Sequence, residues 1–312
     1  MKRIIFVPQY PTPNRYQEWW ATKFPEEFIK AGFNVHVLGG NKIYEMKHRR
    51  GDLSMFSPIH AAIEFECYQI DEYMNMELRD DDILFVADIS FPGFFCNTLF
   101  HKRTDKMFAF CHATSLNYKD YFEEVRNVKY PVETSHAAMF NKVFVGSKYH
   151  QDKLGWYNTV VTYLPFPPLL SQKNIKKYEI ISASRPSPQK VNLNLEKDVE
   201  AKFSEIIRKD TRSWDEYFKF FSESVVLLIS SHEDTFGYQI VDAIMNGCIP
   251  IAPNKCAYPE LLSREYLYND KEELFKIIND ALWGLLDVPK LKCKNQMNDF
   301  YDRIIEEIRN AI

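Results

Sequence analysis

The chain has 312 residues, with 43 acidic and 39 basic side chains and a formal net charge of −4. This length suggests two domains of ordinary size, and 46% hydrophobic residues are enough to give them a substantial core. The charge balance excludes a general polyanion-binding protein that relies on a basic surface. No apolar run approaches the roughly 20 residues of a membrane-spanning helix.

The N-terminus and the cysteines favour a cytoplasmic location. Residues 1–8 lead directly into an apolar strand and lack the apolar length and cleavage site of a signal peptide. The six cysteines are scattered, and no two form a Cys-x-x-Cys pair. We therefore expect reduced, buried thiols and no structural zinc site.

Short apolar runs alternate with segments of helical length in the first half of the chain. A helix is expected at 17–31, closed by Gly32. Strands are expected at 3–8, 34–38, 63–68, 83–87, 107–111 and 142–145. Strand–helix–strand order with buried strands predicts a parallel sheet with right-handed crossovers.

A proline-rich segment, Tyr163-Leu-Pro-Phe-Pro-Pro168, divides the chain because it can form neither a helix nor a central strand. We therefore predict one domain at 1–165 and a second at 166–295. Further strands are expected at 178–183, 225–230 and 249–252, and further helices at 196–208, 214–222, 237–246, 271–286 and 296–310.

The segment from 231 to 253 carries the most chemical information. It places Asp234 before a Phe-Gly turn and Asp242 eight residues later, within an apolar helix. Backbone N–H groups at a helix N-terminus lack internal partners and, with the helix dipole, attract a diphosphate. Gly237 allows positive φ and close approach of a ligand. The alternative is that Asp234 is only an N-cap and Asp242 a solvated helix residue.

This Asp-x7-Asp block resembles the E-x7-E block of retaining glycosyltransferases of family 4, which have the GT-B fold. The resemblance implies an α/β chain with two Rossmann-like domains facing a central cleft. The first would bind the acceptor, and the second, compact one the nucleotide sugar. It also implies that residues 296–312 form a helix that returns to the first domain. The donor-binding residues implied are Glu233, Asp234, Thr235, Phe236, Gly237, Tyr238 and Asp242.

Two cations resemble those that hold the donor diphosphate in this family. Arg185 follows the strand expected at 178–183, and Lys190 comes five residues later. Cations aimed at a leaving diphosphate stabilise the charge that it gains, and Arg does so with a fork of donors. The alternative for this pair is a proline-rich surface turn.

His112 stands at the carboxyl end of the strand expected at 107–111, where ligands bind in open α/β sheets. Family 4 enzymes often place a histidine there, against the transferred sugar, so we expect His112 to act with Arg185, Lys190 and Asp234 in catalysis. Acceptor contacts are expected from loop residues of the first domain. They are Asn14, Arg15, Ser115, Asn117 and Tyr118.

No metal is expected. The acidic run at 80–82 precedes a strand, at the wrong end of the sheet for a ligand, and is predicted to be a solvated turn. The two cations would replace the divalent metal of other glycosyltransferases. The expected co-substrate is a UDP- or GDP-linked sugar, with no further cofactor.

Residues 230–278 resemble in their sequence motifs the family of mannosyltransferases that glycosylate queuosine in tRNA. The shared features are His232-Glu233 before Phe-Gly, then Gly-Cys-x-Pro at 247–250 and Ala-Tyr-Pro-Glu at 257–260. The chain also resembles phage enzymes that glycosylate modified DNA bases, which are compact and of related design. We therefore expect retaining hexosyl transfer to a hydroxyl of a modified nucleobase in DNA or tRNA. The alternatives are a glycan or lipid acceptor, a sugar-nucleotide 2-epimerase, and a catalytically dead sugar-nucleotide-binding module.

Overall fold

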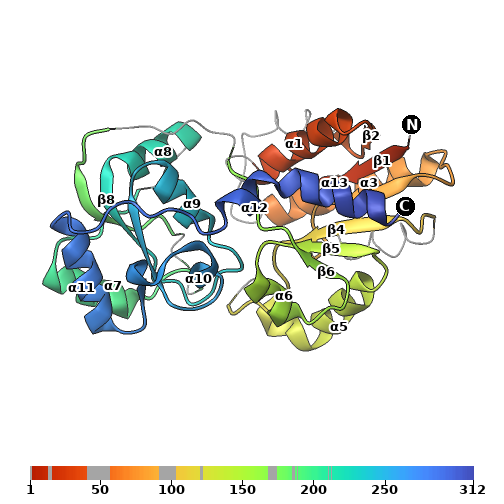
Figure 1. The fold of residues 1–312 in the computed structure, drawn as a ribbon. Helices are drawn as coiled ribbons and strands as arrows, with labels where there is room; N and C mark the ends of the chain where they lie inside the picture. Colours follow the sequence, from red (N-terminus) through yellow and green to blue (C-terminus); the bar gives the residue numbers. More distant parts are fainter. Residues whose placement is uncertain are drawn as a thin grey trace.

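The computed structural model describes residues 2–12, 16–40, 57–90, 103–119, 122–167, 174–184, 187, 189–209, 211 and 213–312, without the side chains of 57–60. Within these ranges two parallel sheets form the centres of two halves of the chain (Figure 1). The first sheet has the order β2-β1-β3-β4-β5-β6 and the second β10-β9-β8-β7. This confirms the predicted α/β class. No helix in the described part of the chain has the length and apolarity to cross a membrane.

Within the described ranges, the first sheet has six short strands. They are β1 (Arg3–Val7), β2 (Asn34–Val37), β3 (Ile83–Val86), β4 (Met107–Cys111), β5 (Lys142–Val145) and β6 (Thr159–Val161). The helices of this half are α1 (Tyr16–Lys30), α3 (Ser57–Asn75), α5 (Arg126–Ala137) and α6 (Lys148–Leu154), with a 3-10 turn η2 (Glu123–Val125). Strands β3 and β4 are buried along their whole length, as helices on both faces of a parallel sheet require.

The strand predicted at 63–68 is wrong, because this segment lies within α3. The buried positions of this helix include Ala62, Phe65, Glu66, Gln69 and Tyr73, which are separated by three or four residues along one face. This is helical spacing, and the short apolar run at 63–68 concealed it. Strand β6, in turn, was not predicted.

The second half is smaller. Its strands are β7 (Tyr178–Ile181), β8 (Ser224–Leu228), β9 (Ile249–Pro253) and β10 (Leu267–Tyr268). Its helices are α7 (Leu193–Lys202), α8 (Trp214–Ser222), α9 (Tyr238–Met245), α10 (Tyr258–Leu261) and α11 (Lys271–Leu282), with a 3-10 turn η3 (Arg264–Tyr266).

Two of these helices end earlier than predicted. Helix α7 stops at Lys202, and Ile207 instead forms a parallel bridge with Ile181 of β7. Helix α11 stops at Leu282, two residues before Gly284, which has φ +70°. A glycine in the left-handed conformation just past the last turn is a common helix stop, and the sequence carried this signal.

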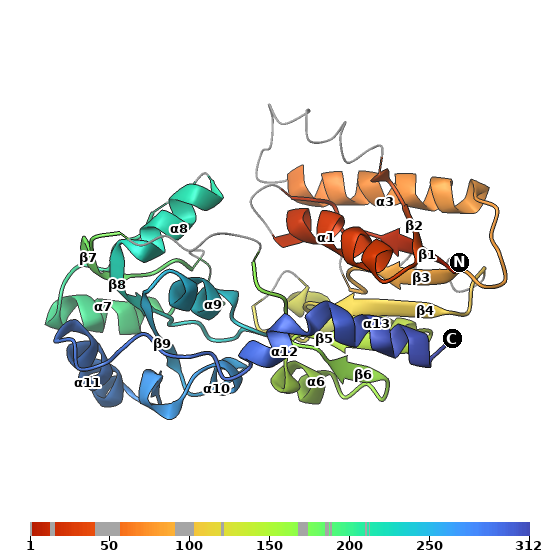
Figure 2. The ribbon, with the colours of Figure 1, turned by 45° about the horizontal axis from the view of Figure 1, so that its top comes forward.

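The last helices return to the first half, as predicted (Figures 1 and 2). The expected single helix is divided at Asp299 into α12 (Lys294–Asn298) and α13 (Phe300–Asn310). The Phe300 ring lies 5.7 Å from Trp20 and 5.8 Å from Phe24, measured between ring centroids. Arg309 Nη2 donates to the carbonyl of Ala31 at 2.7 Å. Helix α13 therefore covers α1 and completes the core of the first half.

Asp82 is not the solvated residue that was expected. It is buried, and its carboxylate accepts from Arg3 Nε at 2.9 Å and Nη2 at 2.5 Å. Burial alone would raise its pKa, but the hydrogen bonds from Arg3 and from the Arg79 backbone hold the pKa below its usual value. Because it lies at the amino end of β3, this ion pair is structural and far from the ligand-binding edge.

Replacement of Phe300 by Ala should lower the free energy of unfolding by about 3–5 kcal/mol, because it leaves a cavity between α13 and α1. Urea denaturation measures this loss. Glu306→Ala, at an exposed position of the same helix, is the matched control. Equal stability of the two variants would contradict the packing role of α13.

Candidate functional site

The predicted residues of the two halves meet where both sheets end. Thr235 Oγ1, after β8, donates to the carbonyl of His112, after β4, at 2.9 Å. Ser147 Oγ, after β5, donates to the carbonyl of Thr235 at 2.5 Å. The segment 231–237 therefore lies against the loops that follow β4 and β5. These are the carboxyl ends of parallel strands, the edge at which open α/β sheets bind ligands.

Lys190 and Asp234 form an ion pair at this junction. Lys190 Nζ lies 2.8 Å from Asp234 Oδ2 and donates to the Glu233 carbonyl at 3.3 Å. Asp234 Oδ1 also accepts from the N–H of Phe236 at 3.2 Å, which shapes the turn before α9. Both side chains of the ion pair remain partly exposed, so an incoming anion can compete for the ammonium group. Arg185 lies outside the described residues.

Gly237 suits its position because a side chain there would be strained and crowded. It has φ +99°, and an added Cβ would lie 3.0 Å from the Tyr258 ring. It precedes Tyr238, the first residue of α9, whose hydroxyl donates to the carbonyl of Pro165 at 2.9 Å. The N-terminus of α9, where the first N–H groups lack i−4 partners within the helix and the dipole end is positive, therefore follows Asp234 by only a few residues.

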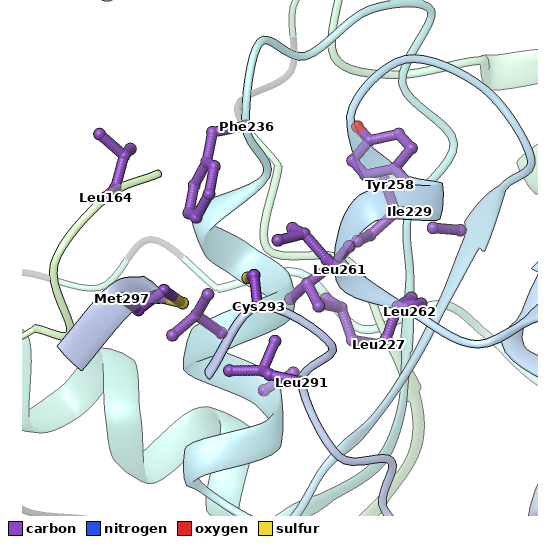
Figure 3. Close-up of a cluster of buried hydrophobic side chains, with 14 of the residues drawn as sticks. Leu164, Leu227, Ile229, Phe236, Tyr258, Leu261, Leu262, Leu291, Cys293 and Met297 are labelled. Atoms are coloured by element: carbon purple, nitrogen blue, oxygen red, sulfur yellow. The ribbon is translucent and has the colours of Figure 1, made fainter. Parts of the chain in front are cut away.

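Phe236 anchors this turn in the hydrophobic core. Figure 3 shows its ring near Leu164 and Met297, in the same cluster as Tyr258. Only 3% of its surface is exposed. Phe236 was predicted to bind the donor, but its side chain holds the loop, and only its backbone is left for a ligand.

Glu233, also predicted to bind the donor, joins the two halves. It is buried and forms an ion pair with Lys153 of α6. Its carboxylate also accepts from the Tyr118 N–H at 2.6 Å and from the Tyr149 hydroxyl at 3.1 Å. Glu260 reinforces this contact, since its carboxylate accepts two N–H bonds at the start of α6, both at 2.8 Å. Two carboxylates of the second half thus hold α6.

His112 lies among aromatic rings. The ring centroids of Trp20, Phe110 and Tyr16 lie 4.5, 4.7 and 4.9 Å from its own. Burial lowers its pKa to about 3, so the imidazole is neutral at physiological pH. Within the described residues its Nε2 atom has no hydrogen-bond partner. A neutral imidazole suits a sugar hydroxyl, because it can donate or accept without adding charge.

Asp242 is buried on α9 and meets α8. Its Oδ2 atom accepts from the Tyr217 hydroxyl at 3.1 Å. Burial raises the pKa of Asp242 to about 7, and the Tyr217 hydrogen bond partly opposes this shift. Tyr217 was not predicted, because its reach to Asp242 depends on how α8 packs on α9. A ribose hydroxyl that bound Asp242 would have to share or displace this bond.

Comparison with known proteins gives a local and a global likeness. No family model matches the sequence. A stretch of 88 residues is 31% identical to the tRNA-queuosine alpha-mannosyltransferase of Drosophila melanogaster, and it covers 28% of this chain and 22% of that protein. The matched part is thus about a fifth of this relative's length.

Solved structures resemble the whole chain. The lipopolysaccharide outer core galactosyltransferase WaaB matches with a TM-score of 0.63 and 12% identity, covering 100% of this chain and 99% of that one. Trehalose-6-phosphate synthase OtsA matches with a TM-score of 0.61 and 12% identity, covering 99% of both. The sucrose-phosphate synthase of Thermosynechococcus elongatus has the same TM-score and identity, covering 100% and 95%. The chain has the GT-B fold.

In this GT-B chain, the predicted acceptor-side residues separate into buried and exposed groups. Ser115 is buried, and both its N–H and hydroxyl donate to the carboxylate of Glu133. Asn117 is also buried and accepts from the N–H of Thr114 at 2.9 Å. Tyr118 is 42% exposed. Asn14 and Arg15 lie outside the described residues.

A buried polar cluster beneath this loop was not predicted. Asp88, at the carboxyl end of β3, accepts from Gln9 Nε2 at 2.5 Å and from the Ser90 N–H at 3.0 Å. Burial raises its pKa to about 8. Lys129 and Glu133 form a buried ion pair beside Ser90. The sequence carried a signal for Asp88, because Asp88 follows β3 at its carboxyl end as His112 follows β4.

No group of three His, Cys, Asp or Glu side chains in the described ranges is arranged to hold a metal ion.

The raised pKa of Asp242 makes stability depend on pH. Between the ordinary value of 3.8 and about 7, the unfolded chain has released this proton and the folded chain still holds it. Folding then takes up a proton, so stability falls as pH rises through this window. We expect Asp242→Asn, which cannot titrate, to gain stability relative to wild type by up to about 1.4 kcal/mol per pH unit there.

Urea denaturation of both proteins at about pH 5 and about pH 8 measures this difference. All other titrating groups are shared, so the difference isolates Asp242. Parallel pH profiles for the two proteins would show that Asp242 has an ordinary pKa.

Proposed function

We propose that the chain transfers a hexosyl group from a UDP- or GDP-linked sugar to an acceptor hydroxyl with retention of configuration. The observation that carries the proposal is the Lys190–Asp234 pair, 2.8 Å apart, in front of the N-terminus of α9 in a GT-B fold. A cation, a carboxylate and a helix N-terminus there match the diphosphate and the sugar hydroxyls of such a donor.

Lys190 and the N–H groups at the start of α9 would stabilise the leaving diphosphate. Its negative charge grows as the bond between the sugar anomeric carbon and the phosphate oxygen breaks, so fixed positive groups lower the barrier. The acceptor oxygen forms its bond to the same carbon on the same face. Its proton passes to the departing phosphate oxygen, so this step needs no protein nucleophile. By resemblance, Arg185 would supply the second cation.

His112 and Asp234 would orient the transferred sugar. When the diphosphate draws Lys190 away, the Asp234 carboxylate becomes able to accept from sugar hydroxyls. The neutral imidazole of His112 would contact another hydroxyl from the first half. Thr235 and Tyr238 hold the intervening loop through their bonds to His112 and Pro165. Lys190 and Arg185 would act in place of a metal.

For the acceptor, the local likeness to a tRNA-queuosine mannosyltransferase supports a modified nucleobase. The lipopolysaccharide galactosyltransferase among the structural neighbours supports the alternative, a glycan or lipid acceptor. A second candidate function is a sugar-nucleotide-binding module without catalysis. The Asp242–Tyr217 bond favours it, because that carboxylate is already engaged where the donor ribose is expected.

Thermal unfolding with a panel of UDP- and GDP-sugars should show stabilisation by one donor, by about 2.7 kcal/mol at a hundredfold excess over Kd. Lys190→Ala should weaken the binding of that donor at least tenfold, because the diphosphate loses a charged partner. Lys197→Ala, an exposed lysine on α7, is the control. Equal shifts for both variants would contradict the assignment of Lys190.

Donor hydrolysis separates the enzyme from the binding module. We expect slow release of nucleoside diphosphate that persists in EDTA and is lost in Arg185→Ala and Lys190→Ala. Proton NMR of the first-formed sugar product should show the donor's anomeric configuration. A donor that binds but is never cleaved, even with acceptors present, would establish the module instead.

A further inference from the structure

An aromatic and cationic rim borders the proposed site. It consists of Tyr118 and Lys119 after β4, His232 after β8 and Lys255 after β9. These loops come from both halves and share the carboxyl edge of the sheets. The rim is continuous with the site, because the Tyr118 N–H donates to Glu233, the residue next to Asp234.

The members of the rim lie close together. The His232 ring lies edge-on to Tyr118, with centroids 5.9 Å apart. Lys119 Nζ lies 5.1 Å from the centroid of the Tyr118 ring. Burial lowers the pKa of His232, and Lys255 and Lys119 lower it further, so both ammonium groups act on the same imidazole. Positive charge thus gathers around one exposed tyrosine.

The backbone holds Tyr118 and Lys119 outward. Lys119 has φ +51°, a conformation that costs energy for a lysine. Its N–H donates to Glu123 Oε2 at 2.8 Å, and the preceding N–H donates to Glu233 at 2.6 Å. Two successive N–H groups are thus fixed by carboxylates. A strained conformation that its surroundings maintain is typical of functional positions.

The rim lysines differ from the other lysines of the site. Lys153 and Lys190 are ion-paired with Glu233 and Asp234. Within the described ranges, no ion pair involves Lys119 or Lys255, and both residues are exposed. Their charges are therefore available to an anionic ligand, at a place where an exposed aromatic face is available as well.

We propose that this rim binds the acceptor, and that the acceptor is a single-stranded segment of nucleic acid. A base would stack on Tyr118 while flanking phosphates contact Lys119 and Lys255. Proteins hold unpaired strands by stacking bases on aromatic side chains and by placing cationic side chains against the phosphates. The inference rests on the proposed function for the identity of the site. A footprint of two lysines agrees with a chain whose net charge is −4, since no extended basic surface is needed.

The test is fluorescence anisotropy of the full chain with a fluorescein-labelled RNA hairpin that has a single-stranded loop. We expect salt-sensitive binding that Lys119→Glu and Lys255→Glu each weaken at least tenfold. Each lost phosphate contact should reduce the slope of log K against log salt by about 0.7. Tyr118→Ala should weaken binding about 5- to 150-fold, and Tyr118→Phe should restore it because stacking needs only the ring.

Lys276→Glu is the matched control. It makes the same charge change at an exposed position on α11 (Figure 1), a helix that contributes no residue to the rim, and should bind as wild type does. A blunt duplex without a loop should bind more weakly than the hairpin. Equal weakening by the three charge reversals, or no salt-sensitive binding of the hairpin, would overturn the proposal. So would rim-dependent binding to phosphatidylglycerol vesicles without binding to RNA.

The donor-induced thermal shift of the wild-type chain is an independent readout. A donor shift without hairpin binding would reject the rim inference and leave the proposed transferase intact. Rim-dependent hairpin binding without a shift or cleavage of any donor would reject the transferase and leave a nucleic-acid-binding surface.

Discussion

The contact between the segment 232–237 and the loops of the first sheet is the constraint on which the site depends. Glu233 and Thr235 bind first-half residues through side-chain oxygens, and Phe236 is inserted into the core beside Leu164. The Glu233 carboxylate is buried, and such a charge is tolerated only when its oxygens are satisfied. Lys153, Tyr149 and the Tyr118 backbone satisfy it. Displacing this segment would leave a buried charge unpaired. The contacts of Glu233 therefore fix the positions of Asp234 and Gly237 relative to the first half.

Charge is distributed unevenly around this turn. Glu233 and Glu260 serve the contact with α6, whereas Lys190 and Asp234 neutralise each other at a partly exposed position. Deeper in the protein, burial favours the uncharged forms of His112 and Asp242. Among the described lysines around this turn, Lys153 and Lys190 are ion-paired, whereas no described ion pair involves Lys119 or Lys255. An anionic donor and an anionic acceptor would meet complementary potential at adjacent places.

Much of the fold could be predicted because buried parallel strands are short apolar runs between helices. Eight strands were found in this way, including β4 with His112 at its end. The apolar run at 63–68 was wrongly predicted as a strand because it belongs to a helix with one buried face. The roles of Glu233 and Asp242 could not be predicted in full. Their partners, Lys153 and Tyr217, are 80 and 25 residues away in sequence, and only tertiary packing brings them together. The spacing of acids along the chain identified the right turn but not which carboxylate faces a ligand.

The return of α13 to α1 also affects how the chain folds during synthesis. Phe300 and Ile304 complete a core that contains Trp20 and Phe24, yet the ribosome makes them nearly three hundred residues later. Until then the nascent first half exposes an apolar face. Contacts of such high sequence separation form slowly and leave intermediates prone to aggregation. The late synthesis of α13 therefore leaves α1 as an apolar surface of the nascent chain that can aggregate.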